Sequence, residues 1–70
     1  MITKEIKQIL PGKFYRDKQF RFRYVLVWSK IDKEHYLCSF RRTDKLSREK
    51  INIFEEYILR YYEEWIEMYG

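Results

Sequence analysis

Arginine and lysine side chains in two short segments are the residues of this sequence best suited to bind a partner of opposite charge. Arg21 and Arg23 lie two positions apart, and Arg41 and Arg42 are adjacent, with Lys45 shortly after them. A planar guanidinium group forms paired, charge-assisted hydrogen bonds with phosphate, and several such contacts give an affinity that falls with salt. The pattern predicts binding to the phosphate backbone of a nucleic acid. The predicted contacts are Arg21, Arg23, Arg41, Arg42, Lys45 and Lys18.

Charge is unevenly distributed along the 70 residues. Residues 1–50 contain 14 Lys or Arg against 6 Asp or Glu, whereas residues 51–70 contain one Arg against five Glu. Because a concentrated positive field attracts polyanions, the basic part favours nucleic acid as the partner, and the acidic part is expected to face away from it. Two other interpretations stay open: the cations keep an exposed sheet face soluble, or they bind an acidic protein.

Residues suited to catalysis are few. The chain has one histidine, His35, and one cysteine, Cys38. On a single strand their spacing of three sends them to opposite faces, which excludes a nucleophile–base pair and a metal site within that strand. We therefore predict a protein that is not an enzyme and that needs no metal or cofactor. A toxin-like ribonuclease that works through Arg, Tyr and His side chains is the third hypothesis.

The elements that must position the cations are predicted to be strands. Apolar and polar residues alternate over 20–29, with aromatic and β-branched side chains prominent, which is typical of a strand. Residues 13–16 and 35–43 predict two further strands of an antiparallel sheet. A hairpin loop of three residues places Trp28 opposite Tyr36 and so gathers the apolar side chains on one face, whereas a two-residue loop mixes the faces. We predict the three-residue loop.

Helical spacing of apolar residues predicts a helix at each end of the chain. Ile2, Ile6 and Ile9 precede a Pro-Gly pair, which predicts a short helix that covers Val25 and Val27. From Ser47 to Met68 apolar residues recur every three or four positions, as in an amphipathic helix of about six turns. This long helix is expected to cover the aromatic face of the sheet.

The predicted fold is therefore α+β, a single domain over 1–70. A short N-terminal helix, a three-stranded antiparallel sheet and a long C-terminal amphipathic helix packed on that sheet follow in the order α-β-β-β-α. This order resembles that of double-stranded RNA-binding domains and of HicA-type toxins in topology only. Residues 46–50 read LSREK where the RNA-binding family has a basic cluster, so no residue role is transferred from either family.

Aromatic residues bear on the choice between duplex and single strand. Most of the rings share the face that the long helix is expected to bury, so they cannot stack on bases, and duplex is favoured. The end of the helix is expected to extend beyond the sheet. An alternative function follows: a protein–protein interaction module or inhibitor, in one version a homodimer, that acts through this overhang. Its predicted contacts are Tyr62, Trp65, Ile66 and Tyr69.

The cellular compartment is also suggested by the sequence. A single cysteine cannot form an internal disulfide, which fits a reducing environment. Charged residues interrupt each apolar run near residue 1, unlike a signal peptide, and no stretch approaches the roughly 20 apolar residues that cross a bilayer. We therefore expect a soluble, cytoplasmic protein without membrane contacts.

Overall fold

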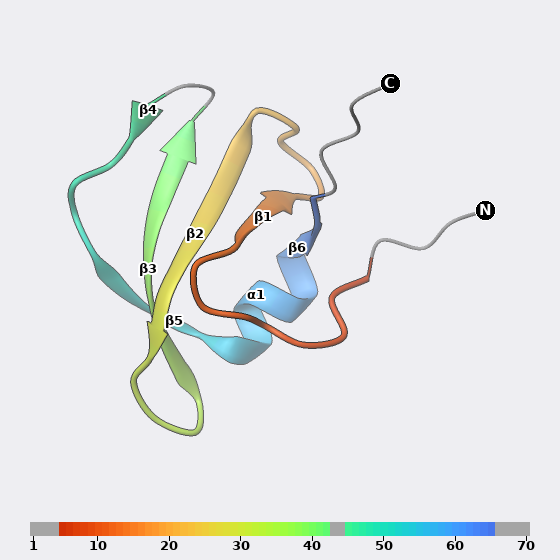
Figure 1. Cartoon of the computed structure of the whole chain (residues 1–70). Coiled ribbons are helices and arrows are strands. Elements are labelled where there is room, and N and C mark those ends of the chain that lie inside the picture. Colours follow the sequence, from red (N-terminus) through yellow and green to blue (C-terminus); the bar gives the residue numbers. More distant parts are fainter. Residues whose placement is uncertain (1–4, 43–44, 66–70) are drawn as a thin grey trace.

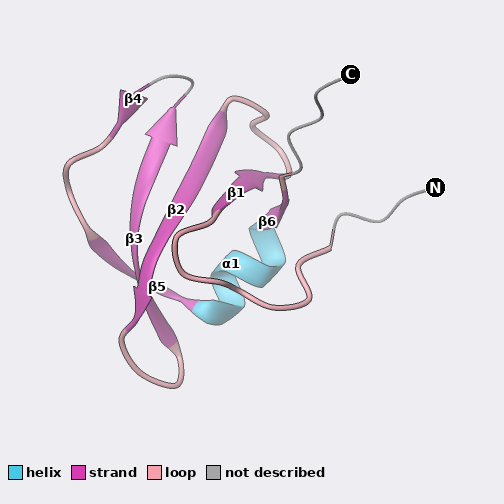
Figure 2. Ribbon diagram, viewed as in Figure 1, coloured by secondary structure: helices cyan, strands magenta, loops and turns pink. Residues whose placement is uncertain are grey.

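The structure is a computed structural model that describes residues 5–42 and 45–65 (Figure 1). Within these residues the chain forms six strands and one short helix (Figure 2). The prediction of a three-stranded sheet beneath a long C-terminal helix is therefore wrong, and the protein is mostly β. The elements are β1 Phe14–Asp17, β2 Arg23–Lys30, β3 His35–Arg42, β4 Lys45–Leu46, β5 Ile51–Phe54, α1 Glu55–Tyr61 and β6 Tyr62–Glu64.

The six strands form one antiparallel sheet in which β1, β2 and β3 are consecutive neighbours. The far edge of β3 is shared: β4 pairs with its Arg41–Arg42 end, and β5 pairs with its His35–Cys38 end. On the other side β6 pairs with β1, so the last strand lies beside the first. Helix α1 links β5 to β6, and Figure 1 shows it lying against one face of the sheet. This topology is not that of an α-β-β-β-α domain.

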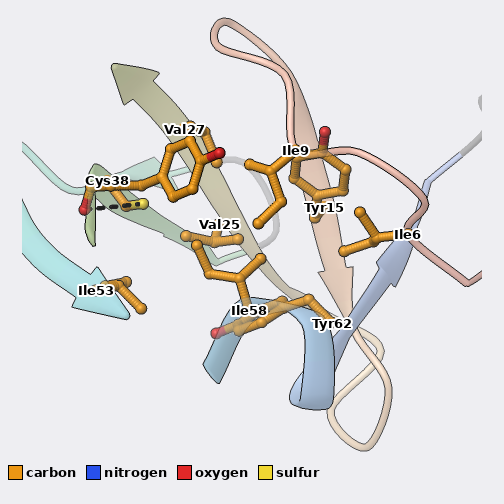
Figure 3. Close-up of a cluster of buried hydrophobic side chains, with 10 residues drawn as sticks. Ile6, Ile9, Tyr15, Val25, Val27, Cys38, Ile53, Ile58 and Tyr62 are labelled. Carbon is orange, nitrogen blue, oxygen red and sulfur yellow. Dashed lines mark hydrogen bonds between the residues drawn. The ribbon is translucent and has the colours of Figure 1, made fainter. Parts of the chain in front are cut away.

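A buried core fills the space between the sheet, α1 and the segment before β1 (Figure 3). Val25, Val27 and Cys38 of the sheet and Ile58 of α1 have no solvent exposure. Burial of apolar surface is the main force that holds such a small domain together. The remaining members of the core cluster are Ile6, Ile9, Tyr15, Tyr36, Ile53 and Tyr62.

The register of the β2–β3 hairpin differs from the prediction, which placed Leu26 opposite Cys38. Leu26 lies opposite Ser39 and Val27 opposite Cys38, and the pairing shifts by one residue just after Val27. Up to Val27, the pairing is therefore the one that the two-residue loop would give. It places the compact Val25 and Val27 on the inner face, against the helix, and turns the larger side chains outward. The outward residues of β2 are Tyr24, Leu26 and Trp28.

The segment before β1 has no helix over residues 5–10, so the predicted N-terminal helix is wrong where the structure describes it. Ile6 and Ile9 are nevertheless buried against Val25 and Val27, which confirms that this segment covers the valines. The hydroxyl group of Tyr15 accepts a hydrogen bond from the backbone N–H of Leu10 at 2.7 Å and donates one to the carbonyl of Gln8. These bonds anchor the segment without a helix. Ile2 lies outside the described residues.

The predicted C-terminal helix is replaced by a strand, two turns of helix and another strand. Phe54 is extended, with φ −64° and ψ 137°, and Tyr62 is extended after the helix, with φ −121° and ψ 158°. The flanking strands satisfy their backbone groups on β3 and β1, bonds that a continuous helix could not make. The aromatic and β-branched residues on both sides of α1 favour this outcome. Among the described residues no helix is long and apolar enough to cross a membrane.

Burial of Cys38 predicts that the protein loses stability at alkaline pH. Burial raises the pKa of this thiol to about 11, and it also raises the pKa of Tyr15 and Tyr62. The unfolded chain, with a thiol pKa of about 8.5, releases its proton first, so the free energy of unfolding falls as pH rises from about 8.5 to 11. We expect a loss of about 3 kcal/mol from the thiol alone. Urea unfolding at several pH values checks this, and the same decline in Cys38→Ala would contradict it.

Candidate nucleic-acid interface

Four of the six predicted cations lie around one hollow at the end of the β2–β3 hairpin. Arg23 is the direct cross-strand partner of Arg42, and Arg42 is in turn the partner of Lys45. With Arg41 these residues line a hollow of about 480 Å³, which we call the basic hollow. The other lining residues are Phe40, Leu46 and Ser47. Within the described residues the lining thus combines four cationic groups with two apolar side chains and contains no carboxylate.

Two exposed phenylalanines support the arginines of the basic hollow. The guanidinium carbon of Arg23 lies 4.8 Å from the ring centroid of Phe20, and that of Arg42 lies 5.2 Å from the centroid of Phe22. The two rings are 6.2 Å apart and are 41% and 44% exposed. Like charges opposite each other on paired strands repel, and stacking on an aromatic ring offsets part of that cost. Because stacking uses the flat face of the guanidinium group, its N–H edge is left to meet a phosphate.

The other two predicted cations do not line the basic hollow. Arg21 forms an ion pair with Glu63 of β6. Lys18 follows β1, where its backbone N–H donates to the carbonyl of Tyr61, and its side chain lines a separate hollow near the end of α1. That second hollow also contains Asp17. Lys18 thus shares this second hollow with Arg23 but does not join Arg42 and Lys45, and Arg21 is occupied by Glu63.

The outer face of the sheet carries a cluster of aromatic rings around Arg41. The guanidinium carbon of Arg41 lies 5.0 Å from the centroid of Phe14 and 5.8 Å from that of Tyr24. Trp65 packs on the same rings, with its centroid 4.9 Å from that of Tyr24 and 6.4 Å from that of Phe14. Trp65 is thus part of the sheet surface and not of a helical overhang.

The remaining overhang residues are also placed differently from the prediction. Tyr62 is 1% exposed and belongs to the core, so its ring cannot contact a partner. Ile66 and Tyr69 lie outside the described residues. The expectation that most rings lie beneath a long helix is wrong as well, because the rings of the core cluster are those of Tyr15, Tyr36 and Tyr62. The aromatic residues that are more than a third exposed are Phe20, Phe22, Trp28, Phe54, Tyr57 and Tyr61.

His35 organises the β2–β3 loop. Its Nδ1 atom lies 2.9 Å and 3.0 Å from the two carboxylate oxygens of Asp32, and its ring packs on Phe54 with centroids 4.3 Å apart. A hydrogen bond from the backbone N–H of Glu34 and contact with His35 lower the pKa of Asp32. Cys38 is buried in the core, away from this loop. Among the described residues no group of three or more side chains is arranged to hold a metal ion.

Acidic side chains gather at the opposite end of β3 from the basic hollow. Glu34, Glu55 and Glu56 surround the exposed ring of Phe54, which pairs with His35 at the start of β3. Arg42 ends the same strand, seven residues later. At about 3.3 Å per residue the strand separates the two ends by about 23 Å. Part of the acidic C-terminal segment therefore lies far from the basic hollow, whereas Glu63 and Glu64 of β6 lie beside β1 and pair with Arg21 and Lys13.

Comparison with protein-family models, with curated proteins and with solved structures found no match for this chain. The functional argument therefore depends on the geometry alone. Sequence reasoning missed Phe20 and Phe22 as site residues because it assigned them to the buried face. The alternation Phe-Arg-Phe-Arg over residues 20–23 was the pattern that could have identified them.

Proposed function

We propose that this chain is a small nucleic-acid-binding protein that contacts the phosphate backbone through Arg23, Arg42 and Lys45, with Arg41 at the edge of the same hollow. The observation that carries the proposal is that Arg23, Arg42 and Lys45, from three neighbouring strands, are cross-strand partners and line one hollow. Phosphate binding needs several donors on a surface that fits around the backbone, and each neutralised phosphate adds to the affinity by releasing counterions. The position of Glu34, Glu55 and Glu56 at the far end of β3 supports the proposal, because these carboxylates are kept away from a polyanion at the hollow.

Binding without catalysis is the activity that fits this set of side chains best. Guanidinium, ammonium and hydroxyl groups in the lining can hold a phosphate and stabilise its charge. Among the described residues the lining has no histidine or carboxylate that could act as a general base. Phosphate contacts position a protein on nucleic acid but do not read its sequence. We therefore propose binding with little sequence preference.

Fluorescence anisotropy with labelled nucleic acids tests the proposed function directly. Suitable probes are single strands of DNA and RNA of about 12 nucleotides and the corresponding duplexes, titrated at about 50 to 200 mM salt. We expect micromolar or tighter binding to at least one probe. With three or four phosphate contacts, the logarithm of the affinity should fall with the logarithm of salt with a slope of about −2 to −3. Unchanged anisotropy with all four probes would refute the function.

A further inference from the structure

Phe20 and Phe22 form a pair of solvent-exposed rings beside two arginines of the basic hollow, and Phe20 itself lines the neighbouring hollow that contains Lys18. They stand two residues apart, just before β2, and their centroids are 6.2 Å apart. Each ring packs against an arginine that lines the basic hollow, and each retains more than 40% of its surface in solvent. Two neighbouring aromatic rings in contact with solvent, each beside a cation, provide flat apolar surface next to a phosphate donor.

We propose that the ligand of the basic hollow is a single strand of DNA or RNA whose bases stack on Phe20 and Phe22. This proposal rests on the proposed function and specifies its ligand. Arg23 and Arg42 would contact the phosphates while a base packs on the exposed surface of each ring. Their guanidinium carbons lie only 4.8 and 5.2 Å from the ring centroids. A phosphate donor and a stacking surface are thus both within the span of one nucleotide.

Stacking is the reason to favour a single strand over a duplex. In a duplex each base is already stacked and paired, so a protein ring reaches a base face only after the base is unstacked, at a cost in free energy. In a single strand the faces are accessible, and aromatic rings combined with a basic groove are the usual means of binding it without sequence preference. The prediction of duplex depended on buried rings, and the exposure of Phe20 and Phe22 removes that premise.

A comparison of normal and abasic strands tests the stacking. The probes are a labelled oligo-dT of about 12 nucleotides and a strand of equal length that has the same phosphates but no bases. We expect the unmodified protein to bind oligo-dT about tenfold more tightly than the abasic strand. The double variant Phe20→Leu, Phe22→Leu should lose this preference and bind both probes as weakly as the unmodified protein binds the abasic one. Because neither side chain belongs to the buried core and leucine keeps the site apolar, the melting temperature should change little.

Phe54→Leu is the matched control, since it makes the same change at a ring that is 56% exposed but lies beside glutamates. Its affinity for oligo-dT should equal that of the unmodified protein. Oligo-rU in a parallel titration distinguishes RNA from DNA as the tighter ligand. If the double variant still prefers oligo-dT over the abasic strand tenfold, the stacking proposal is wrong although the proposed function stands. If the unmodified protein binds a duplex but neither of these strands, the single-strand proposal is wrong although the proposed function stands. If it binds no single-stranded or duplex probe, the proposed function itself fails.

Discussion

Replacement of Arg23, Arg42 and Lys45 by glutamine should lower the affinity for nucleic acid by about 100-fold at low salt. Each substitution removes one phosphate contact, so the slope of affinity against salt should also become flatter, by about 2 for single strands. The three side chains line the basic hollow and are exposed, with Arg23 opposite Arg42 and Lys45 opposite Arg42. Removing the repulsion between them should leave the fold intact or slightly more stable. Salt-dependent anisotropy measures both quantities on the same samples.

Lys7, Lys30 and Lys33 provide the matched control for this triple variant. They do not line the basic hollow, and Lys30 and Lys33 lie at the loop end of the β2–β3 hairpin, the end farther from it. Replacing all three by glutamine removes the same net charge. We expect its affinity to fall less than tenfold, through the general field alone. Equal losses in the two triple variants would show that net charge, and not the basic hollow, determines the affinity.

Local alternation was sufficient to predict the three central strands. The stretch 20–29 covers β2 except its last residue, 35–43 contains β3 and 13–16 overlaps β1. Their register could not be obtained in the same way, because both candidate loops give faces with several apolar residues. The inner face was decided by packing: Val25 and Val27 fit beneath Ile58 and Ile9, whereas Tyr24 and Trp28 are accommodated on the outer face. That choice depends on elements distant in sequence.

Non-local pairing explains the larger error at the C-terminal end. Ile51 and Ile58 stand at helical spacing, and a local rule therefore predicts one helix through both. Residues 51–54 and 62–64 instead form strands that pair with β3 and β1, respectively. Hydrogen bonds to those edges form only in the folded chain, so the apolar periodicity within the segment does not indicate them. Tertiary context overrides helix propensity in this way.

The grouping of the predicted cations was obtained only in part: Arg23 and Arg42 lie together, whereas Arg21 pairs with Glu63. Arg23 and Arg42 end the two long strands of one hairpin on the same side, so a register slip of one residue moves them by only one position. The two arginines were therefore predicted to be close to each other even though the predicted register was wrong by one residue. The side of the sheet on which each side chain lies did depend on the register. Arg41 packs on the outer aromatic cluster, while Arg23 and Arg42 stack on Phe20 and Phe22. The exposure of Phe20 and Phe22 depends on the side of the sheet that they occupy, so the wrong register led us to expect that they are buried.

Tyr61 and Tyr62 provide the sharpest test of the fold, because they are adjacent in sequence and have opposite environments. Tyr62 is 1% exposed and belongs to the core cluster, whereas Tyr61 is 47% exposed on α1. Removing a buried aromatic side chain leaves a cavity, so Tyr62→Ala should cost about 3–5 kcal/mol, most of the stability of a domain this small. Tyr61→Ala should cost about 1 kcal/mol or less, chiefly through its contact with Tyr57. Thermal unfolding followed by circular dichroism measures both.

The difference between these two variants also decides between two descriptions of the C-terminal segment. In a continuous helix that extends past the sheet, both tyrosines would be exposed near its end, and both alanine variants would melt close to the unmodified protein. In the closed arrangement, Tyr62 inserts beside Ile58 where β6 joins β1, so its loss should lower the melting temperature by more than about 10 °C. Equal melting temperatures would indicate that Tyr62 lies at the surface, where a protein partner could contact it.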